Sequence, residues 1–204
     1  MTEIHTPLSR TVAGLVALIA LAALAVRVWL STVETGGDLG AALWDLGRFF
    51  TILTNTLVML VLGAIALGAD GPRAAWLAAL TVAIMLVGVI YHVLLADLVD
   101  YAGLAAWADH GVHTAVPLGM AIWWLGFAPK RALRYLDLPV FIVWPLLYLT
   151  YALIRGARDG VYPYPFVDLT ALTPAEVAVN VAGITLILLI AGVMVIFLGR
   201  RAAQ

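Results

Sequence analysis

Cysteine is absent from this chain of 204 residues, and charged side chains are scarce. Without cysteine the protein has neither disulfides nor thiolate chemistry. Asp, Glu, Lys and Arg together make up 11% of the residues, whereas a soluble domain has about a quarter. The net charge of −1 gives no basic surface for nucleic acid, so we expect no such partner. No polar stretch is long enough to predict a soluble domain, which leaves an integral membrane protein.

Long apolar runs are what the chain has instead, and 64% of its residues are hydrophobic. A bilayer core of about 30 Å is crossed by about 20 helical residues. Six runs have spanning length, at roughly 11–30, 46–67, 74–95, 108–127, 138–154 and 175–198. They predict an all-α polytopic membrane protein, with a single domain over residues 1–204 whose six transmembrane helices form one bundle.

Basic residues indicate how these helices are oriented, because they concentrate on the cytoplasmic side of a membrane. With the N-terminus inside, the inner segments hold 7 of the 11 Lys and Arg residues, namely Arg10, Arg73, Lys130, Arg131, Arg134, Arg200 and Arg201. The outer loops are acid-rich instead. We therefore expect both termini in the cytoplasm and, for the location, the inner (plasma) membrane of a bacterium.

The stretch Asp109-His110-Gly111-Val112-His113-Thr114 brings two imidazoles and a carboxylate to the mouth of an apolar run. Ionisable groups inside a membrane are costly and usually functional. Thr51 and His113 each lie about five residues below the outer end of their runs, roughly 7–8 Å deep at the helical rise. Asp109, four residues before His113, can fix the tautomer of that ring and leave its other nitrogen as an acceptor. The sequence thus permits a Thr51–His113–Asp109 relay, in which the histidine takes the proton of a hydroxyl nucleophile.

Two further residues are expected to support this relay. Trp44, Arg48, Thr51 and Asn55 recur at helical spacing and share one face of a continuous second helix. One turn below Thr51, Asn55 can donate a hydrogen bond to an oxyanion. His110 shares a face of the fourth helix with His113.

Three blocks of this sequence resemble a known family. Phe49-Phe50-Thr51-Ile52-Leu53-Thr54-Asn55 is similar to the family's Phe-Leu-Thr opening of the second helix, in its bacterial form. Asp109 to Pro117 is similar to its Asn-His-Gly-x-His-Thr-x-Val block, and Val161-Tyr162-Pro163-Tyr164-Pro165-Phe166 to its Tyr-Pro-Phe loop. The family is that of the six-pass androgen-induced and androgen-dependent TFPI-regulating membrane proteins and their bacterial relatives.

The resemblance implies a lipid hydrolase, which cleaves fatty acid esters of hydroxy fatty acids. We expect no cofactor. By motif position, the family's threonine nucleophile corresponds to Thr51 and its histidine to His113. The chain departs from the family in two places: Asp109 stands where the animal proteins have Asn, and the loop reads Tyr-Pro-Tyr-Pro-Phe.

Several residues near the expected outer face are candidates for binding the lipid substrate. Arg155 or Arg158 can hold a free carboxylate at the interface. Trp144, which precedes a helical proline, can form a pocket wall, and Tyr162 and His92 reach the same level of the membrane.

Two other classes of function fit the sequence. One is a metal-dependent membrane lipid hydrolase, in which His92, His110 and His113 bind zinc. The other is a non-catalytic lipid-binding scaffold or a small transporter. The inner halves of the expected helices are nearly all apolar, which favours a lipid site over a pore. The oligomeric state is left open by the sequence.

Overall fold

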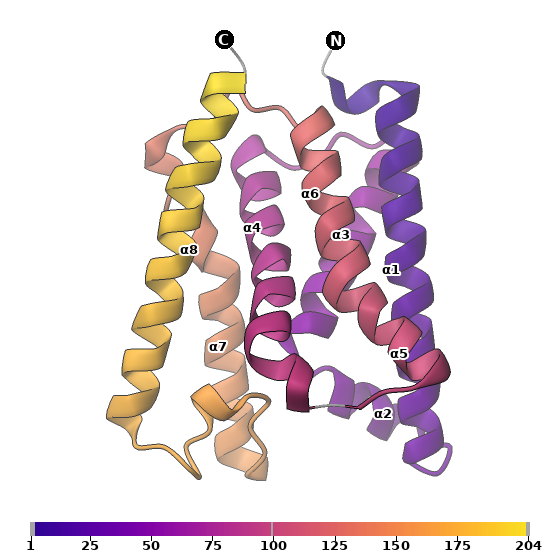
Figure 1. Ribbon diagram of the computed structural model, residues 1–204, viewed down its shortest axis with the longest axis vertical. Helices are drawn as coiled ribbons and strands as arrows, with labels where there is room; N and C mark the ends of the chain where they lie inside the picture. Colours follow the sequence, from indigo (N-terminus) through magenta and orange to yellow (C-terminus); the bar gives the residue numbers. More distant parts are fainter. Residues whose placement is uncertain (1–2, 99, 203–204) are drawn as a thin grey trace.

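The computed structural model describes residues 3–98 and 100–202, and over these ranges the chain forms helices and no β-strand (Figure 1). The α-helices are α1 (Pro7–Glu34), α2 (Leu39–Leu46), α3 (Phe50–Ala66), α4 (Ala74–Ile90), α5 (Gly103–His110), α6 (Val116–Phe127), α7 (Val140–Asp159) and α8 (Pro174–Ala202). Two π-helical turns continue α4 and join α5 to α6: η2 (Tyr91–Leu95) and η4 (Gly111–Ala115). Short 3₁₀ turns are η1 (Glu3–His5), η3 (Ala96–Leu98), η5 (Tyr135–Asp137) and η6 (Pro165–Val167).

Within the described ranges, four helical segments are long and apolar enough to cross a membrane: Pro7–Glu34, Ala74–Leu95, Tyr135–Asp159 and Pro174–Arg201. A fifth results if α2 and α3, which meet at an angle of 96°, count as one broken span. Their surfaces expose many large apolar side chains, such as Val179 at 71% and Leu147 at 62%. Apolar surface on this scale is what a helix facing lipid presents. The all-helical architecture expected from the sequence is confirmed, and its four or five long apolar segments are compatible with an integral membrane protein.

The expected second helix, 46–67, is wrong at its start. Helix α2 ends at Leu46, Gly47 and Arg48 form a turn, and Phe49 is extended (φ −93°, ψ 130°) before α3 begins at Phe50. The side chain of Arg48 holds the bend, because it donates to the Asp159 carboxylate and, at 2.7 Å, to the carbonyl of Val161. Trp44 and Arg48 therefore do not share a helical face with Thr51.

The expected fourth helix, 108–127, is longer than predicted. It begins at Gly103 and runs through α5, η4 and α6 to Phe127, with the π turn in the middle. Its histidines and Asp109 make this segment less apolar than the four spanning helices. Gly111 brings it against α1, since a Cβ there would lie only 2.6 Å from the Cβ of Ala23.

Helix α4 lies at the centre of the bundle, where it packs against α3, α6, α7 and α8, while α1 packs chiefly against α3. Large side chains such as Trp123, Phe141 and Leu62 fill the core. Figure 1 shows α1 and α8 on opposite flanks and both chain ends at the same end of the bundle. The basic segments expected on the inner side are at that end, and the η6 loop is at the other.

Candidate functional site

The Thr51 hydroxyl and the His113 imidazole meet between α3 and η4. Thr51 Oγ1 lies 3.4 Å from His113 Nε2. Thr51 is the second residue of α3, so the carbonyl four residues earlier belongs to the bend and not to a helical turn. Other helical threonines donate to that i−4 carbonyl: Thr11, Thr32, Thr56, Thr81 and Thr150. The bend at Gly47–Phe49 thus leaves the Thr51 hydroxyl directed at the histidine.

Asp109 holds the other side of the same ring. His113 Nδ1 lies 3.1 Å from a carboxylate oxygen of Asp109 and 3.1 Å from its main-chain carbonyl. Both are acceptors, so Nδ1 carries the proton and Nε2 faces Thr51 as an acceptor. Asp109 is only 4% exposed, and this contact compensates its burial. The three groups have the order hydroxyl, base and carboxylate of a nucleophilic relay.

Tyr91 fixes the plane of the His113 ring. The two rings are stacked, with centroids 3.8 Å apart and planes 8° from parallel. The Tyr91 phenol lies beside the Asp109 carboxylate as well. A ring that is stacked on one face and held at Nδ1 has little freedom to rotate, so Nε2 stays directed at Thr51.

Two sequence features allow α4 to approach the histidine this closely. Pro117 has no N–H, so the carbonyl of His113 lacks its usual helical partner one turn on. Gly88 of α4 packs against that carbonyl, and a Cβ on Gly88 would lie 3.0 Å from it. Both Tyr91 and His113 lie in π turns, which occur mostly at functional sites.

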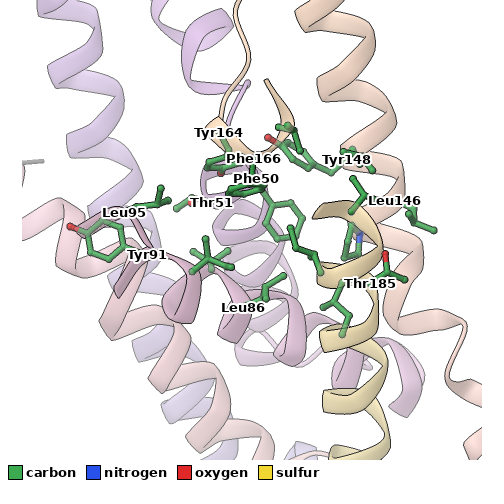
Figure 2. Close-up of a pocket in the computed structure, with 18 of the residues that line it drawn as sticks. Phe50, Thr51, Leu86, Tyr91, Leu95, Leu146, Tyr148, Tyr164, Phe166 and Thr185 are labelled. Carbon is green, nitrogen blue, oxygen red and sulfur yellow. The ribbon is translucent and has the colours of Figure 1, made fainter. Parts of the chain in front are cut away.

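A cavity of about 100 Å³ opens beside Thr51 (Figure 2), and His113 also lines it. Three phenols line it, those of Tyr91, Tyr148 and Tyr164. The remaining wall is almost entirely apolar and comes from α3, α4, η2, α7, η6 and α8, with Leu86, Leu146, Ile184 and Leu188 among its residues. Leu146 is 39% exposed on α7, so the cavity reaches the outer surface of the bundle there.

Asn55 lies next to the pair in a different role from the one expected. Its side-chain amide donates to the carbonyl of Thr51 at 2.8 Å and to that of Val112 at 3.1 Å. Both amide hydrogens are used in this way, which leaves none for an oxyanion. Asn55 instead ties α3 to η4 and so fixes the distance between Thr51 and His113.

The other two histidines lie apart from the pair. His92 is exposed and its Nε2 is 2.9 Å from the hydroxyl of Thr114, and His110 is also exposed. Over residues 3–98 and 100–202 no three His, Asp or Glu side chains are placed to hold a metal ion. The zinc arrangement of His92, His110 and His113 therefore has no geometric support.

The residues expected to bind substrate do not line the cavity. Arg155 is buried against the Trp44 ring, 3.9 Å from its centroid, and donates to Tyr151 and Asp159. Arg158 is exposed. The ring of Tyr162 covers Gly156.

Trp144 donates to the hydroxyl of Thr54 at 3.0 Å and stacks on Phe50, so it supports the cavity wall from behind.

Sequence reasoning missed Tyr164 and Phe166 as cavity residues. Both belong to the Tyr-Pro-Tyr-Pro-Phe loop that the sequence singles out, but the second tyrosine, not Tyr162, points into the cavity (Figure 2). Their rings stack on each other, with centroids 5.2 Å apart. Burial raises the pKa of the Tyr164 phenol above its usual value, which keeps the hydroxyl protonated at neutral pH.

Comparison of the chain with protein-family models, with curated proteins and with solved structures found no match.

Proposed function

We propose that the protein is an intramembrane hydrolase of lipid carboxylic esters, with Thr51 as nucleophile, His113 as general base and Asp109 as the group that orients the base. One observation carries this proposal: the Thr51 hydroxyl is 3.4 Å from an imidazole nitrogen whose partner nitrogen is held by a buried carboxylate, and both face an apolar cavity. A threonine hydroxyl is a weak nucleophile without such a base.

The chemistry then follows in two halves. Thr51 Oγ attacks the ester carbonyl carbon while His113 Nε2 takes its proton, and the carbonyl oxygen becomes an oxyanion. The ester C–O bond breaks and His113 returns the proton to the departing alkoxide, which leaves an acyl-threonine. Water attacks this acyl group with His113 again as base, and Thr51 regains its proton when the fatty acid departs.

Lipid is the substrate class that suits the walls of the cavity. An acyl chain gains about 0.8 kcal/mol for each methylene removed from water, and the lining residues here are largely apolar. A cavity of about 100 Å³ holds only the part of a lipid near its ester bond, so the rest of the chain lies in the bilayer. The likeness of three blocks to the androgen-induced family supports fatty acid esters of hydroxy fatty acids as substrates.

We also propose how the protein lies in the membrane. The segment 103–127 and the bent pair α2–α3 bring the number of spans from four to six. An even number agrees with chain ends that lie together (Figure 1). The basic residues at that end favour the cytoplasm as its location, by the positive-inside rule. The site then opens toward the outer leaflet, in the inner membrane of a bacterium.

Covalent labelling tests the nucleophile directly. Purified protein in detergent is treated with a fluorophosphonate ester probe, and the modified residue is mapped by mass spectrometry. We expect the label on Thr51, and we expect both labelling and ester hydrolysis to be lost in Thr51→Ala and in His113→Ala.

Thr56→Ala is the matched control for Thr51→Ala, because Thr56 is a partly buried threonine of the same helix whose hydroxyl bonds the carbonyl of Ile52. The Thr56→Ala protein should react with the probe and hydrolyse the ester at the same rates as the unaltered protein. Full ester hydrolysis by folded Thr51→Ala protein would overturn the proposal.

A further inference from the structure

An ester carbonyl that is attacked by Thr51 needs a hydrogen-bond donor for the charge that develops on its oxygen. Such donors are commonly the largest single contribution to acyl-transfer catalysis. Asn55, the donor expected from the sequence, has no hydrogen to give. The donor must therefore come from another polar group in the wall of the cavity.

Most polar side chains of that wall are already used. Thr51 and His113 are the proposed nucleophile and base. The Tyr148 hydroxyl donates to the carbonyl of Arg48 at 2.8 Å, and the Tyr91 phenol lies beside the Asp109 carboxylate. Thr185 belongs to α8 and lies on the far side of the cavity from Thr51 (Figure 2). Among the described side chains that line the cavity this leaves the hydroxyl of Tyr164, whose polar neighbours are Thr51, Tyr148 and the N–H groups at the start of α3.

Tyr164 is in the right place to meet the substrate carbonyl. Its hydroxyl lies beside the Thr51 hydroxyl and the backbone N–H groups of Phe50 and Thr51 at the start of α3. Those N–H groups favour negative charge near the phenol oxygen, because the first turn of a helix has no internal acceptor for them. Phe49, at the N-cap, offers no side-chain hydrogen bond in their place.

The ring of Tyr164 is held on two sides. Phe166 stacks on it at 5.2 Å with planes 3° apart, and Phe49 meets it edge-on at 6.3 Å. The loop is tied to α8, because the Asn180 side chain donates to the carbonyl of Phe166 at 2.9 Å. A donor whose position is fixed in advance needs no reorganisation when charge develops, and this is what makes it effective.

We propose that the Tyr164 hydroxyl donates a hydrogen bond to the oxyanion of the tetrahedral intermediate, and this rests on the hydrolase function proposed above. No proton is transferred from Tyr164. The bond forms as Thr51 Oγ adds to the carbonyl carbon and the C=O electron pair moves to oxygen. It weakens again when the ester C–O bond breaks and the carbonyl is restored.

Tyr164→Phe tests this role, because it removes only the hydroxyl and keeps the ring that stacks on Phe166. We expect kcat for ester hydrolysis to fall about 10²–10³-fold, the usual effect of removing one such donor. KM should change by less than about threefold, since the bond is made in the transition state and not with bound substrate. The rate of labelling of Thr51 by the fluorophosphonate probe should fall as well.

Tyr162→Phe is the matched control: the same change in the same loop, on a ring that covers Gly156 and does not line the cavity. It should keep the kcat of the unaltered protein. A second variant carries 3-fluorotyrosine at position 164, which retains a hydroxyl on a ring of nearly the same shape. It should recover most of the kcat that Tyr164→Phe loses, and this separates loss of the donor from loss of folding.

The outcomes distinguish failure of this inference from failure of the proposed function. If Tyr164→Phe keeps its kcat while Thr51→Ala is inactive, the oxyanion role is overturned and the hydrolase stands. If Tyr164→Phe changes KM alone, Tyr164 binds the ground state and the inference is again overturned. If Thr51→Ala and Tyr164→Phe are both fully active, the hydrolase proposal itself fails.

Discussion

At the scale of single residues, the site depends on polar groups that position one another. Asn55 is fully buried and bonds two main-chain carbonyls, one on each of the segments that carry Thr51 and His113. Asp109 and Tyr91 fix the imidazole in the same way from two other directions. In the interior of a bundle these bonds are formed without competition from water, so the distance between hydroxyl and imidazole is set before any substrate binds.

Replacement of Asp109 by Asn should reduce kcat without abolishing it. In the proposed mechanism the carboxylate charge stabilises the imidazolium that forms when His113 takes the proton of Thr51, and the amide lacks this charge. The main-chain carbonyl of Asp109, also 3.1 Å from Nδ1, still holds the tautomer. We expect a fall of about tenfold, roughly 1.4 kcal/mol in the barrier, measured as kcat for ester hydrolysis.

Asp109→Ala removes the side-chain acceptor altogether and should lower kcat further. An unchanged kcat in both Asp109 variants would show that the carboxylate takes no part in catalysis.

The three candidate relay residues were predicted from the sequence by counting along the expected helices and by the likeness of three blocks to a known family. Thr51 and His113 lie at equal depth by counting, and Asp109 is one turn before His113. The use of Asn55 could not be predicted, because it depends on the carbonyl of Val112 in a π turn. Tyr164 was missed because Pro163 and Pro165 set a loop conformation with no periodic pattern, so nothing indicated which tyrosine points inward.

At the scale of elements, the segment 103–127 is the one whose packing most affects the site. Gly111 and Gly88 allow α1 and α4 to press against it from two sides. Its π turn directs His113 toward α3. The sequence predicted the segment 74–95 at the bounds of the observed helix, Ala74–Leu95, because no residue interrupts it. The prediction of a helix over 46–67 was wrong at its start, where Gly47 and the ion pair of Arg48 with Asp159 break the helix. That ion pair joins residues far apart in the chain, so helical periodicity does not reveal it.

Gly111→Ala should loosen this packing. The added Cβ would meet Ala23 at 2.6 Å, so α1 and η4 must move apart. Overpacking of this kind costs about 1–3 kcal/mol. We expect a lower thermal unfolding midpoint in detergent and slower labelling of Thr51, because His113 is two residues away.

Gly126→Ala provides the control on the same helical segment, since a Cβ there meets nothing within 4 Å. It should be neutral or slightly stabilising, because Ala favours a helix over Gly by up to about 1 kcal/mol. Equal midpoints and labelling rates for the two variants would contradict this account of the packing.

At the scale of the whole molecule, the arrangement of the helices could not be predicted from the sequence. Several helices are apolar on every side, so their periodicity does not reveal which face meets protein and which meets lipid. The central place of α4 and the flanking positions of α1 and α8 emerge only from the packed bundle (Figure 1). The cavity exists because α8 and the η6 loop close the space that α4 and α7 leave open.

The small volume of that cavity, about 100 Å³, determines how the proposed enzyme meets its substrate. Most of each lipid stays dissolved in the membrane, so turnover should follow the mole fraction of ester among the surrounding lipids. In vesicles that contain the protein, diluting the ester with inert phospholipid should lower the rate in proportion. Adding buffer to the same vesicles should leave turnover per protein unchanged. An enzyme that takes its substrate from water would slow down, because dilution lowers the concentration of ester in solution. For the proposed enzyme the relevant substrate concentration is therefore a surface density in the membrane.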